Sequence, residues 1–510
     1  MVAKINSLGL MGLEAFLVTI EADLASGLPS FDVVGLPDTS VKESRNRVKS
    51  ALKNCEFEFP TSKITINLAP ADVKKEGSIY DLSILVALLI SSGQLDANLE
   101  NVAFVGELSL SGELCAVKGI LPMASKAKEL GITELFVPAK NAFEAALVED
   151  IQIFPVENIK TLYSHLTGKE KILPAKANLN IDSSTNKLLD FSQVKGQNDA
   201  KRALEIAAAG GHNVILMGPP GSGKSMLAKR IHTILPAMTM NESIETTKIY
   251  SVAGLINNEI PLITTRPFRS PHHTISAVGL SGGGSMPKPG EISLAHNGVL
   301  FLDELPEFSR NAMEILRQPI EDGEVTISRV NGTITYPCSV MLIAAMNPCP
   351  CGYYGHPSKS CICSEKTISK YLARVSGPLL DRIDIHVEVP PIEYSELSSK
   401  KLSESSSKIK NRVDTARKIQ LDRFKEYNIS ANAKITPGLL QKTCILTKNA
   451  ENLLKKAFDN MGLSARAYTR ILKVARTIAD LSFSEEIKSS HIAEAIQYRS
   501  LDRKYWSRKA

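Results

Sequence analysis

The sequence predicts a multidomain α/β protein in which a parallel sheet carries a phosphate-binding loop and a helical domain follows. Three observations support this class. A complete phosphate-loop motif follows a buried-strand pattern. Apolar β-runs alternate with helical patterns from Asp190 to about Pro391, as a parallel sheet requires. Beyond residue 411 only helical spacing remains, and the 510 residues suffice for three or four domains.

Composition and charge are those of an ordinary globular protein. Apolar residues make up 43% of the chain and charged residues 22%. A net charge of +6 permits nucleic-acid binding but does not argue for it, because dedicated binders usually show a dense basic patch. The longest apolar stretch, Leu82 to Ile90, is far shorter than a membrane helix, and no signal-peptide core is present. We therefore expect a soluble, cytoplasmic protein without membrane contact.

The first 167 residues predict a separate domain with its own core. Short β-rich runs alternate there with helical patterns, so the domain is α+β or α/β. The β-runs cover 31–35, 63–67 and 135–138, and the helical patterns cover 39–53, 80–91 and 120–130. Residues 168–189 turn polar, with Pro, Asn and Ser, and are predicted to be a linker.

Three further segments complete the predicted organisation. Residues 190–394 form the α/β core, and residues 395–410, rich in Ser, Lys and Glu, form a polar connector. Residues 411–510 form an all-helical domain, in which 453–458, 468–481 and 491–498 have helical apolar spacing.

The strongest motif is a full match to the G-x4-G-K-[ST] phosphate loop, placed between a strand pattern at 214–217 and a helix pattern at 226–235. Its glycines let successive backbone N–H groups face the phosphates of ATP. Lys224 is expected to pair with the β- and γ-phosphates, and the Ser225 hydroxyl to ligate Mg²⁺. The loop consists of Gly218, Pro219, Pro220, Gly221, Ser222, Gly223, Lys224 and Ser225.

Two other predicted strands end in polar residues that suit the same reaction. The strand at 299–302 is followed by Asp303, expected to reach Mg²⁺ through its water shell, and by Glu304, expected to polarise the attacking water. The strand at 340–345 leads to Asn347, which would bind the lytic water or the γ-phosphate, unless it is simply a turn asparagine. Together these residues predict an ATP hydrolase.

The chain resembles the AAA+ Mg-chelatase-like family, and specifically its YifB/ComM branch. Matching stretches are spread along essentially the whole chain. The stretches are 190–197, 269–274, 289–293, 302–306, 345–352, 376–384 and 464–476. The resemblance implies a ring, usually a hexamer, with nucleotide held between neighbouring subunits. It implies that Arg382 acts in trans on the transferring phosphoryl group, with Arg374 as the alternative. Arg466 resembles the family's second sensor, and Arg470 could substitute for it.

Two segments are candidates for contact with DNA. Residues 279–290 are so rich in Gly and Ser that we expect a loop. Residues 326–335 alternate around Asn331-Gly332, a strong hairpin signal. The first segment resembles an insert that points into the ring's pore in the chelatase-like clade, and the second resembles the clade's hairpin before the first sensor. Lys288, and Arg329 near the hairpin tip, are therefore candidate DNA contacts. The alternative is that both are plain surface loops.

Four cysteines, Cys349, Cys351, Cys361 and Cys363, crowd into two C-x-C pairs. Four thiolates on a short polar loop suit a structural Zn²⁺ ion, and the alternatives are reduced unligated thiols or a redox pair. The adjacent His272 and His273 have no partner at metal-ligand spacing, and we expect them to play a structural role near the nucleotide.

The N-terminal domain resembles the ribosomal-S5-like fold shared with the Lon protease domain, in the segments 75–78, 105–110 and 117–119. The positions that carry Lon's serine and lysine are Ile79 and Leu121 here. Ser78 is off by one and Lys118 precedes the helix, so we expect no peptide hydrolysis and a role in binding or assembly. A rearranged Ser78–Lys118 dyad is the alternative.

The combined prediction is a ring-forming ATPase that translocates DNA or drives branch migration as a helicase, in homologous recombination or natural transformation. Its partners would be single-stranded or branched DNA, further copies of itself and recombination proteins. The second hypothesis is a chelatase-like ATPase that remodels a protein partner for metal insertion. The third, an ATP-dependent protease, is disfavoured by the missing dyad.

Overall fold

The computed structural model describes residues 2–177, 189–257, 260–284, 287–329, 332–392, 394–398, 403–427, 429–501 and 505–506. Backbone contacts divide the chain into two compact units, which we describe separately. Unit 1 comprises Met1–Ile181, Met240–Ile263 and Val330–Tyr336, and unit 2 comprises Asp182–Thr239, Thr264–Arg329 and Pro337–Ala510. In the described part of the chain, no helix has the length and apolar composition that would let it cross a membrane.

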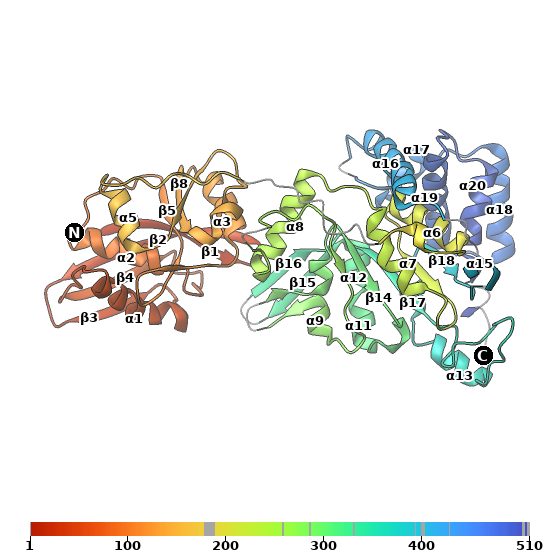
Figure 1. Cartoon of the computed structure of the whole chain (residues 1–510), viewed down its shortest axis with the longest axis horizontal. Coiled ribbons are helices and arrows are strands. Elements are labelled where there is room, and N and C mark those ends of the chain that lie inside the picture. The colour runs from red at the N-terminus through yellow and green to blue at the C-terminus, as the bar shows by residue number, and fades with distance from the viewer. Residues whose placement is uncertain are drawn as a thin grey trace. The chain divides into compact units, whose positions relative to one another are not determined.

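Unit 1 is built on a seven-stranded mixed sheet in the order β3-β4-β2-β1-β5-β8-β9 (Figure 1). β1 pairs with β2, and β2 with β4, in antiparallel fashion, whereas the other neighbours are parallel. The strands are β1 (Ala3–Met11), β2 (Glu14–Ala25), β3 (Ser30–Val34), β4 (Lys63–Ala69), β5 (Val102–Phe104), β8 (Glu134–Pro138) and β9 (Gln152–Val156).

Side chains from the two faces of this sheet belong to two separate cores. In β8, Phe136 belongs to one buried cluster and its neighbours Leu135 and Val137 to the other, because successive strand residues point to opposite faces. The first cluster includes residues of α1 (Thr39–Asn54), α2 (Asp81–Ser91) and α5 (Ile159–Leu166), and the second those of α3 (Ile120–Glu129) and α4 (Ala142–Ala145). The predicted helices and strands of this region are therefore confirmed.

The helix α8 (Met240–Ala253) packs with the N-terminal unit, although the sequence-based boundaries place it inside the 190–394 core. The amide of Gly119 donates to the carbonyl of Ser251 at 3.1 Å. The buried Glu144 carboxylate accepts from the amide of Leu121 at 3.1 Å, and burial raises its pKa while the Ser251 side chain opposes this shift. These contacts are between residues far apart in sequence, which hydrophobic spacing does not encode.

Unit 2 is built on a five-stranded, all-parallel sheet in the order β11-β14-β17-β10-β18 (Figure 1). The predicted alternation of strands and helices is thus confirmed, with α6 (Asn198–Gly210) before β10 and α7 (Lys224–Arg230) after it. The strands are β11 (Phe268–Arg269), β14 (Val299–Leu302), β17 (Met341–Met346), β10 (Val214–Met217) and β18 (Ile385–Glu388).

The C-terminal helices share one hydrophobic core with this sheet. Buried side chains of β10 and β17 lie in the same cluster as those of the helices that follow the sheet. These helices are α16 (Ser406–Arg423), α17 (Pro437–Thr443), α18 (Lys448–Met461), α19 (Ala465–Leu481) and α20 (Ser489–Gln497). The predicted connector at 395–410 includes the end of the short helix α15 (Tyr394–Ser398) and the first residues of α16.

The predicted loop at 279–290 contains a short ladder in its described residues, 279–284 and 287–290. After α9 (Ala277–Ser281), β12 (Gly282–Gly283) pairs in antiparallel fashion with β13 (Lys288–Pro289). Gly282 has φ +97°, and a Cβ there would lie 2.3 Å from the carbonyl oxygen of Lys288, so this close pairing requires glycine. The expectation of a loop was wrong for these four residues because backbone pairing needs no apolar side chains.

The predicted hairpin at 326–335 is confirmed as a two-stranded sheet of β15 (Glu324–Arg329) and β16 (Gly332–Pro337). Its turn at Asn331 lies outside the described residues. Between α9 and β15 lie α11 (Arg310–Ile315) and α12 (Arg317–Asp322).

Candidate nucleotide-binding site

The carboxyl ends of β10, β14 and β17 meet at one edge of the unit 2 sheet, because the three strands are parallel. The phosphate loop follows Met217, the acidic pair follows Leu302 and Asn347 follows Met346. The amide of Gly218 donates to the carbonyl of Met346 at 3.2 Å, which joins the start of the loop to the end of β17. The sheet therefore brings the three predicted nucleotide elements together.

Lys224 lies inside the phosphate loop. Its Nζ donates to the carbonyl oxygens of Gly218 and Pro219 at 2.8 and 2.9 Å and to Oδ1 of Asn347 at 3.1 Å. Burial lowers the pKa of Lys224, and the negative charges of Asp303 and Glu304 oppose that shift. The ammonium group is thus held among oxygen acceptors, and an incoming phosphate can take their place.

Ser225 and Asp303 form the second contact across the site. The Ser225 hydroxyl donates to Oδ2 of Asp303 at 2.5 Å, and Oδ1 of the same carboxylate accepts the amide of Glu304 at 3.0 Å. A hydroxyl and a carboxylate side by side are ligands that Mg²⁺ accepts in nucleotide sites. Gly221 and Gly223 have φ +78° and +90°, conformations that favour glycine and that curl the loop in front of this pair.

Glu304 lies at the open side of the site, with 57% of its side chain exposed. Its φ of +53° is unusual for a residue with a side chain and marks a sharp turn out of β14. Nδ1 of His273 lies 3.5 Å from Oε2 of Glu304, and the rings of His272 and His273 lie 4.1 Å apart. The histidine pair thus lies near the predicted nucleotide site, as expected, and His273 is the member that contacts the carboxylate expected to activate water.

The two candidate trans arginines lie in different environments. Arg374 donates to the carbonyl of Pro306 at 3.2 Å and pairs with Glu307 at 3.0 Å. Both partners closely follow Glu304 in the chain, so Arg374 lies beside the nucleotide site of its own subunit. Arg382 pairs with Glu321 and donates to the carbonyl of Pro378 at 2.8 Å. Its backbone precedes β18, at the edge of the sheet opposite the phosphate loop.

The two candidate second-sensor arginines also differ. Arg466, in the first turn of α19, is exposed, and the described residues offer it no ion-pair partner. Arg470, one turn later, pairs with the buried carboxylate of Asp384. Burial opposes ionisation of that carboxylate, but Arg470 and His212 hold the pKa of Asp384 well below its usual range. Arg470 is therefore already engaged, whereas Arg466 remains available.

The four clustered cysteines converge, with ligand atoms all within 4.8 Å of one another. The Sγ atom of Cys349 lies 3.4 Å from that of Cys351 and 3.7 Å from that of Cys361. Burial and the neighbouring thiols raise the pKa of Cys349 to about 12. Burial opposes ionisation of Cys351 as well, but backbone amides lower its pKa to about 6. Four thiols at such distances fit a tetrahedral metal ion.

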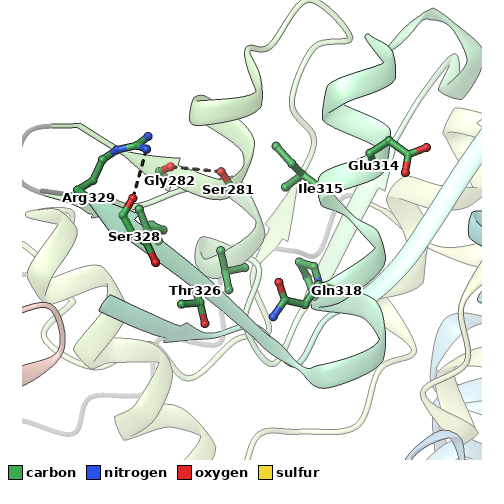
Figure 2. A pocket seen from close by; sticks show the side chains of 11 residues that line it. Ser281, Gly282, Glu314, Ile315, Gln318, Thr326, Ser328 and Arg329 are labelled. Atoms are coloured by element: carbon green, nitrogen blue, oxygen red, sulfur yellow. Dashed lines mark hydrogen bonds between the residues drawn. The ribbon is translucent and has the colours of Figure 1, made fainter. Parts of the chain in front are cut away.

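Lys288 and Arg329, the candidate DNA contacts, both lie next to Gly283. Lys288 pairs in register with Gly283, and Nη2 of Arg329 lies 3.3 Å from the position of a Cβ on Gly283. Arg329 also lines a cavity of about 310 Å³. Figure 2 shows Ser281, Gly282 and Arg329 at one side of this cavity and the helical residues Glu314 and Gln318 across from them.

The alternative protease dyad is not formed. The Ser78 hydroxyl donates to the carboxylate of Glu107, which is not an activating amine. The side chain of Lys118 packs over Gly254, and within the described residues no hydrogen bond joins it to Ser78. The nearby Lys75 is buried and donates to the carbonyl of Pro70. The structure thus offers no activated nucleophile at this position.

Comparison with known proteins gives matches along most of the chain. A family model described as magnesium chelatase, subunit ChlI, matches residues 190–397, and two related ChlI models match residues 20–141 and 403–499. The competence protein ComM of Haemophilus influenzae is 45% identical over 510 residues, covering 98% of each chain. The uncharacterized protein YifB of Escherichia coli is 44% identical, covering 97% of this chain and 96% of its own. The magnesium-chelatase 38 kDa subunit of Rhodobacter capsulatus is 25% identical over 32% of this chain and 52% of its own.

Proposed function

The chain belongs to the YifB/ComM family of Mg-chelatase-like AAA+ proteins, and from this premise we propose that it hydrolyses ATP to move DNA. The observation that carries the hydrolytic part is the meeting of three strand ends at one sheet edge. There the amine of Lys224 is 3.1 Å from Asn347 and the hydroxyl of Ser225 is 2.5 Å from Asp303. Lys224 would hold the β- and γ-phosphates, and Ser225 and Asp303 would hold Mg²⁺.

In the proposed reaction Glu304 orients and polarises the water that attacks the γ-phosphate. Its carboxylate is 57% exposed and is therefore accessible to a water molecule. Mg²⁺, when bound, neutralises charge that develops on the transferring phosphoryl group. Asn347 would meet the γ-phosphate or the attacking water, since it contacts the amine that would bind this phosphate.

The site favours assembly into a ring of identical subunits, with a hexamer as the family's usual form. Arg382 precedes Ile385, which pairs with Val214, whereas the phosphate loop follows Met217 at the other end of the same strand pair. A guanidinium at that edge cannot reach its own nucleotide, so any action on phosphate has to be in a neighbouring subunit. Arg374, on its own site's edge, fits that role less well.

DNA as the substrate rests on Lys288 and Arg329. Lys288 lies on the Gly-rich ladder and Arg329 on the hairpin. Both are exposed and both lie next to Gly283, where a phosphate backbone can be contacted without base readout. The similarity to the competence protein ComM of Haemophilus influenzae favours a role in natural transformation or homologous recombination. Recombination proteins would then be its partners.

The test is the rate of ATP hydrolysis with and without single-stranded or forked DNA across a range of salt concentrations. A DNA motor is stimulated, and the stimulation fades as salt rises because phosphate contacts release counterions. Lys288→Ala and Arg329→Ala variants should lose stimulation while keeping the rate without DNA. A rate that does not respond to DNA at low salt would instead support a second function, the remodelling of a protein partner, which the similarity to a magnesium-chelatase subunit favours.

We further propose that the four cysteines hold a structural Zn²⁺ ion. The arrangement leaves no ligand position open for water, so the metal would stabilise the loop and not take part in hydrolysis. Metal analysis of protein purified without chelators should give about one zinc per chain. Recovery of the protein without metal and with four titratable thiols would overturn this assignment.

A further inference from the structure

The loop that carries the four cysteines touches the phosphate loop directly. Gly352, which follows Cys351, is buried and has φ +82°. A Cβ at this position would lie 2.3 Å from Cδ and 2.7 Å from Cγ of Pro220, which is the third residue of the phosphate loop. The backbone of the cysteine loop thus packs against the proline ring without room for a methyl group.

The same short segment meets the phosphate loop at a second point. Asn347 accepts a hydrogen bond from Lys224 at 3.1 Å, and the amide of Gly352 donates to the carbonyl of Cys349 at 3.0 Å. Cys349 and Cys351 therefore lie between two contacts with the phosphate loop, one polar and one steric. A displacement of these cysteines would therefore be passed to Asn347 and Gly352, the two residues that contact the phosphate loop.

In the described residues, few contacts besides the cysteines hold the rest of this loop; the Tyr354 ring lies edge-on to that of Tyr505, with centroids 6.2 Å apart. From Tyr353 to Thr367 no described residue is buried, and Ile362, between two of the cysteines, is 88% exposed. The turn at 356–359 is held by hydrogen bonds to the His356 ring, which join only neighbouring residues. The loop has no apolar core of its own, so a metal bound by all four thiolates would provide its long-range closure.

From this geometry we propose that the metal bound by the four cysteines positions the phosphate loop for nucleotide. The metal fixes Cys349 and Cys351, these fix Asn347 and Gly352, and Gly352 in turn supports Pro220. The inference rests on the proposed zinc site and adds to it a function: the metal site sets affinity for ATP from outside the nucleotide pocket. Loss of metal, by chelation or thiol oxidation, then weakens nucleotide binding.

A matched pair of glycine variants tests the steric link. Gly352 and Gly355 both have left-handed backbone, with φ +82° and +74°, so replacement by alanine carries a similar backbone cost at both. At Gly355 the nearest atom to an added Cβ is the Tyr505 hydroxyl, at 3.9 Å, whereas at Gly352 it is Pro220. We expect Gly352→Ala to bind a fluorescent ATP analogue at least about tenfold more weakly while keeping its zinc, and Gly355→Ala to bind nearly as the wild type.

A second set of variants tests the metal. The double variant Cys361→Ser/Cys363→Ser should lose zinc and bind the analogue at least about tenfold more weakly. Cys115→Ser, which changes a cysteine of unit 1, should retain both properties. Circular dichroism verifies that each variant is folded, and wild-type protein stripped of zinc and reloaded gives the same comparison without mutation.

The outcomes separate this inference from the proposals it rests on. If zinc is lost and nucleotide affinity is unchanged, or if Gly352→Ala binds like Gly355→Ala, the coupling is wrong and the zinc site stands. If the wild type holds no metal, both fall. If the wild type binds zinc but no ATP analogue, the proposed ATPase falls.

Discussion

Glu304 is the side chain on which the proposed hydrolysis depends most directly. Replacing it with glutamine keeps the shape of the side chain and removes the charge that polarises water. We expect Glu304→Gln to bind nucleotide as the wild type does, since Lys224, Ser225 and Asp303 are untouched, and to hydrolyse ATP at least about 10²-fold more slowly. Phosphate release and binding of a fluorescent analogue measure the two properties. Normal turnover in this variant would remove Glu304 from the chemistry.

His273 should affect the same carboxylate without touching nucleotide. Because Nδ1 lies 3.5 Å from Glu304, its loss frees the carboxylate to adopt other orientations. We expect His273→Ala to lower kcat by about threefold to tenfold with little change in KM, in line with the loss of one interaction with a charged group.

Two further variants make the His273 test specific. His273→Asn places an amide nitrogen near the position of Nδ1 and should restore most of the rate. His272→Ala is the matched control, since that ring bonds Thr274 at 2.9 Å and pairs with no carboxylate in the described residues. Equal losses in His272→Ala and His273→Ala would mean that the histidines act only through the local backbone.

The sequence predicted the residues of this site to the extent that they belong to local motifs. The phosphate loop, the acidic pair and Asn347 each follow a buried strand within a few residues, so spacing along the chain reveals them. His273 and Gly352 act through contacts with Glu304 and Pro220, about 30 and 130 residues away. The histidine pair was expected near the nucleotide, but nothing in the sequence assigns His273 to Glu304 or Gly352 to Pro220.

At the scale of elements, one ion pair joins α19 to the strand β18. Arg470 of α19 pairs with Asp384, which lies directly before β18 and also accepts the amide of Asn213 at 3.1 Å. The carboxylate is 3% exposed, so removal of its charge leaves Arg470 with an incomplete partner. We expect Asp384→Asn to lower the free energy of unfolding by about 3 kcal/mol, measured by denaturant titration.

The same pair gives a pH dependence with a definite sign. The pKa of Asp384 is lowered by Arg470 and His212 against the effect of burial, so the folded state binds its proton less tightly than the unfolded state. Its contribution to stability is complete above the ordinary aspartate pKa of about 4 and is lost as pH falls below it. Thermal unfolding between about pH 6 and pH 3 should show a smaller decline for Asp384→Asn than for the wild type.

Elements with a regular spacing of apolar residues could be predicted from the sequence, whereas elements that depend on contacts with distant backbone groups could not. The helices at 39–54 and 120–129 follow from apolar periodicity, and Gly131 marks the end of the second. The ladder of β12 and β13 involves glycines with no side chain to show a pattern, and α8 groups with unit 1 through contacts such as Gly119 to Ser251. Both depend on backbone groups that every residue has, so residue types along the sequence do not indicate them.

At the scale of the whole molecule, the proposed ring predicts that two inactive variants restore each other. Lys224→Ala cannot bind phosphates but still presents Arg382, and Arg382→Ala binds nucleotide but presents no guanidinium to its neighbour. Each alone should hydrolyse ATP at least about 10²-fold more slowly than the wild type. A mixed ring contains interfaces where an intact lysine meets an intact arginine, so mixing should restore a substantial fraction of the rate.

The dependence on mixing ratio makes the result specific to a shared site. Restored activity should peak near equal amounts of the two variants, because an active interface needs one of each. The control is a mixture of Lys224→Ala with Glu304→Gln, two changes in the same pocket. Every pocket in this mixture lacks either the lysine or the glutamate, so mixing should restore no activity although all arginines are intact. Arg374→Ala mixed with Lys224→Ala distinguishes the two arginines, since Arg374 pairs with Glu307 on its own sheet edge and its loss should not be restored by a neighbour. If the Arg382→Ala mixture stays inactive while the subunits still assemble, the arginine that completes the site is not Arg382.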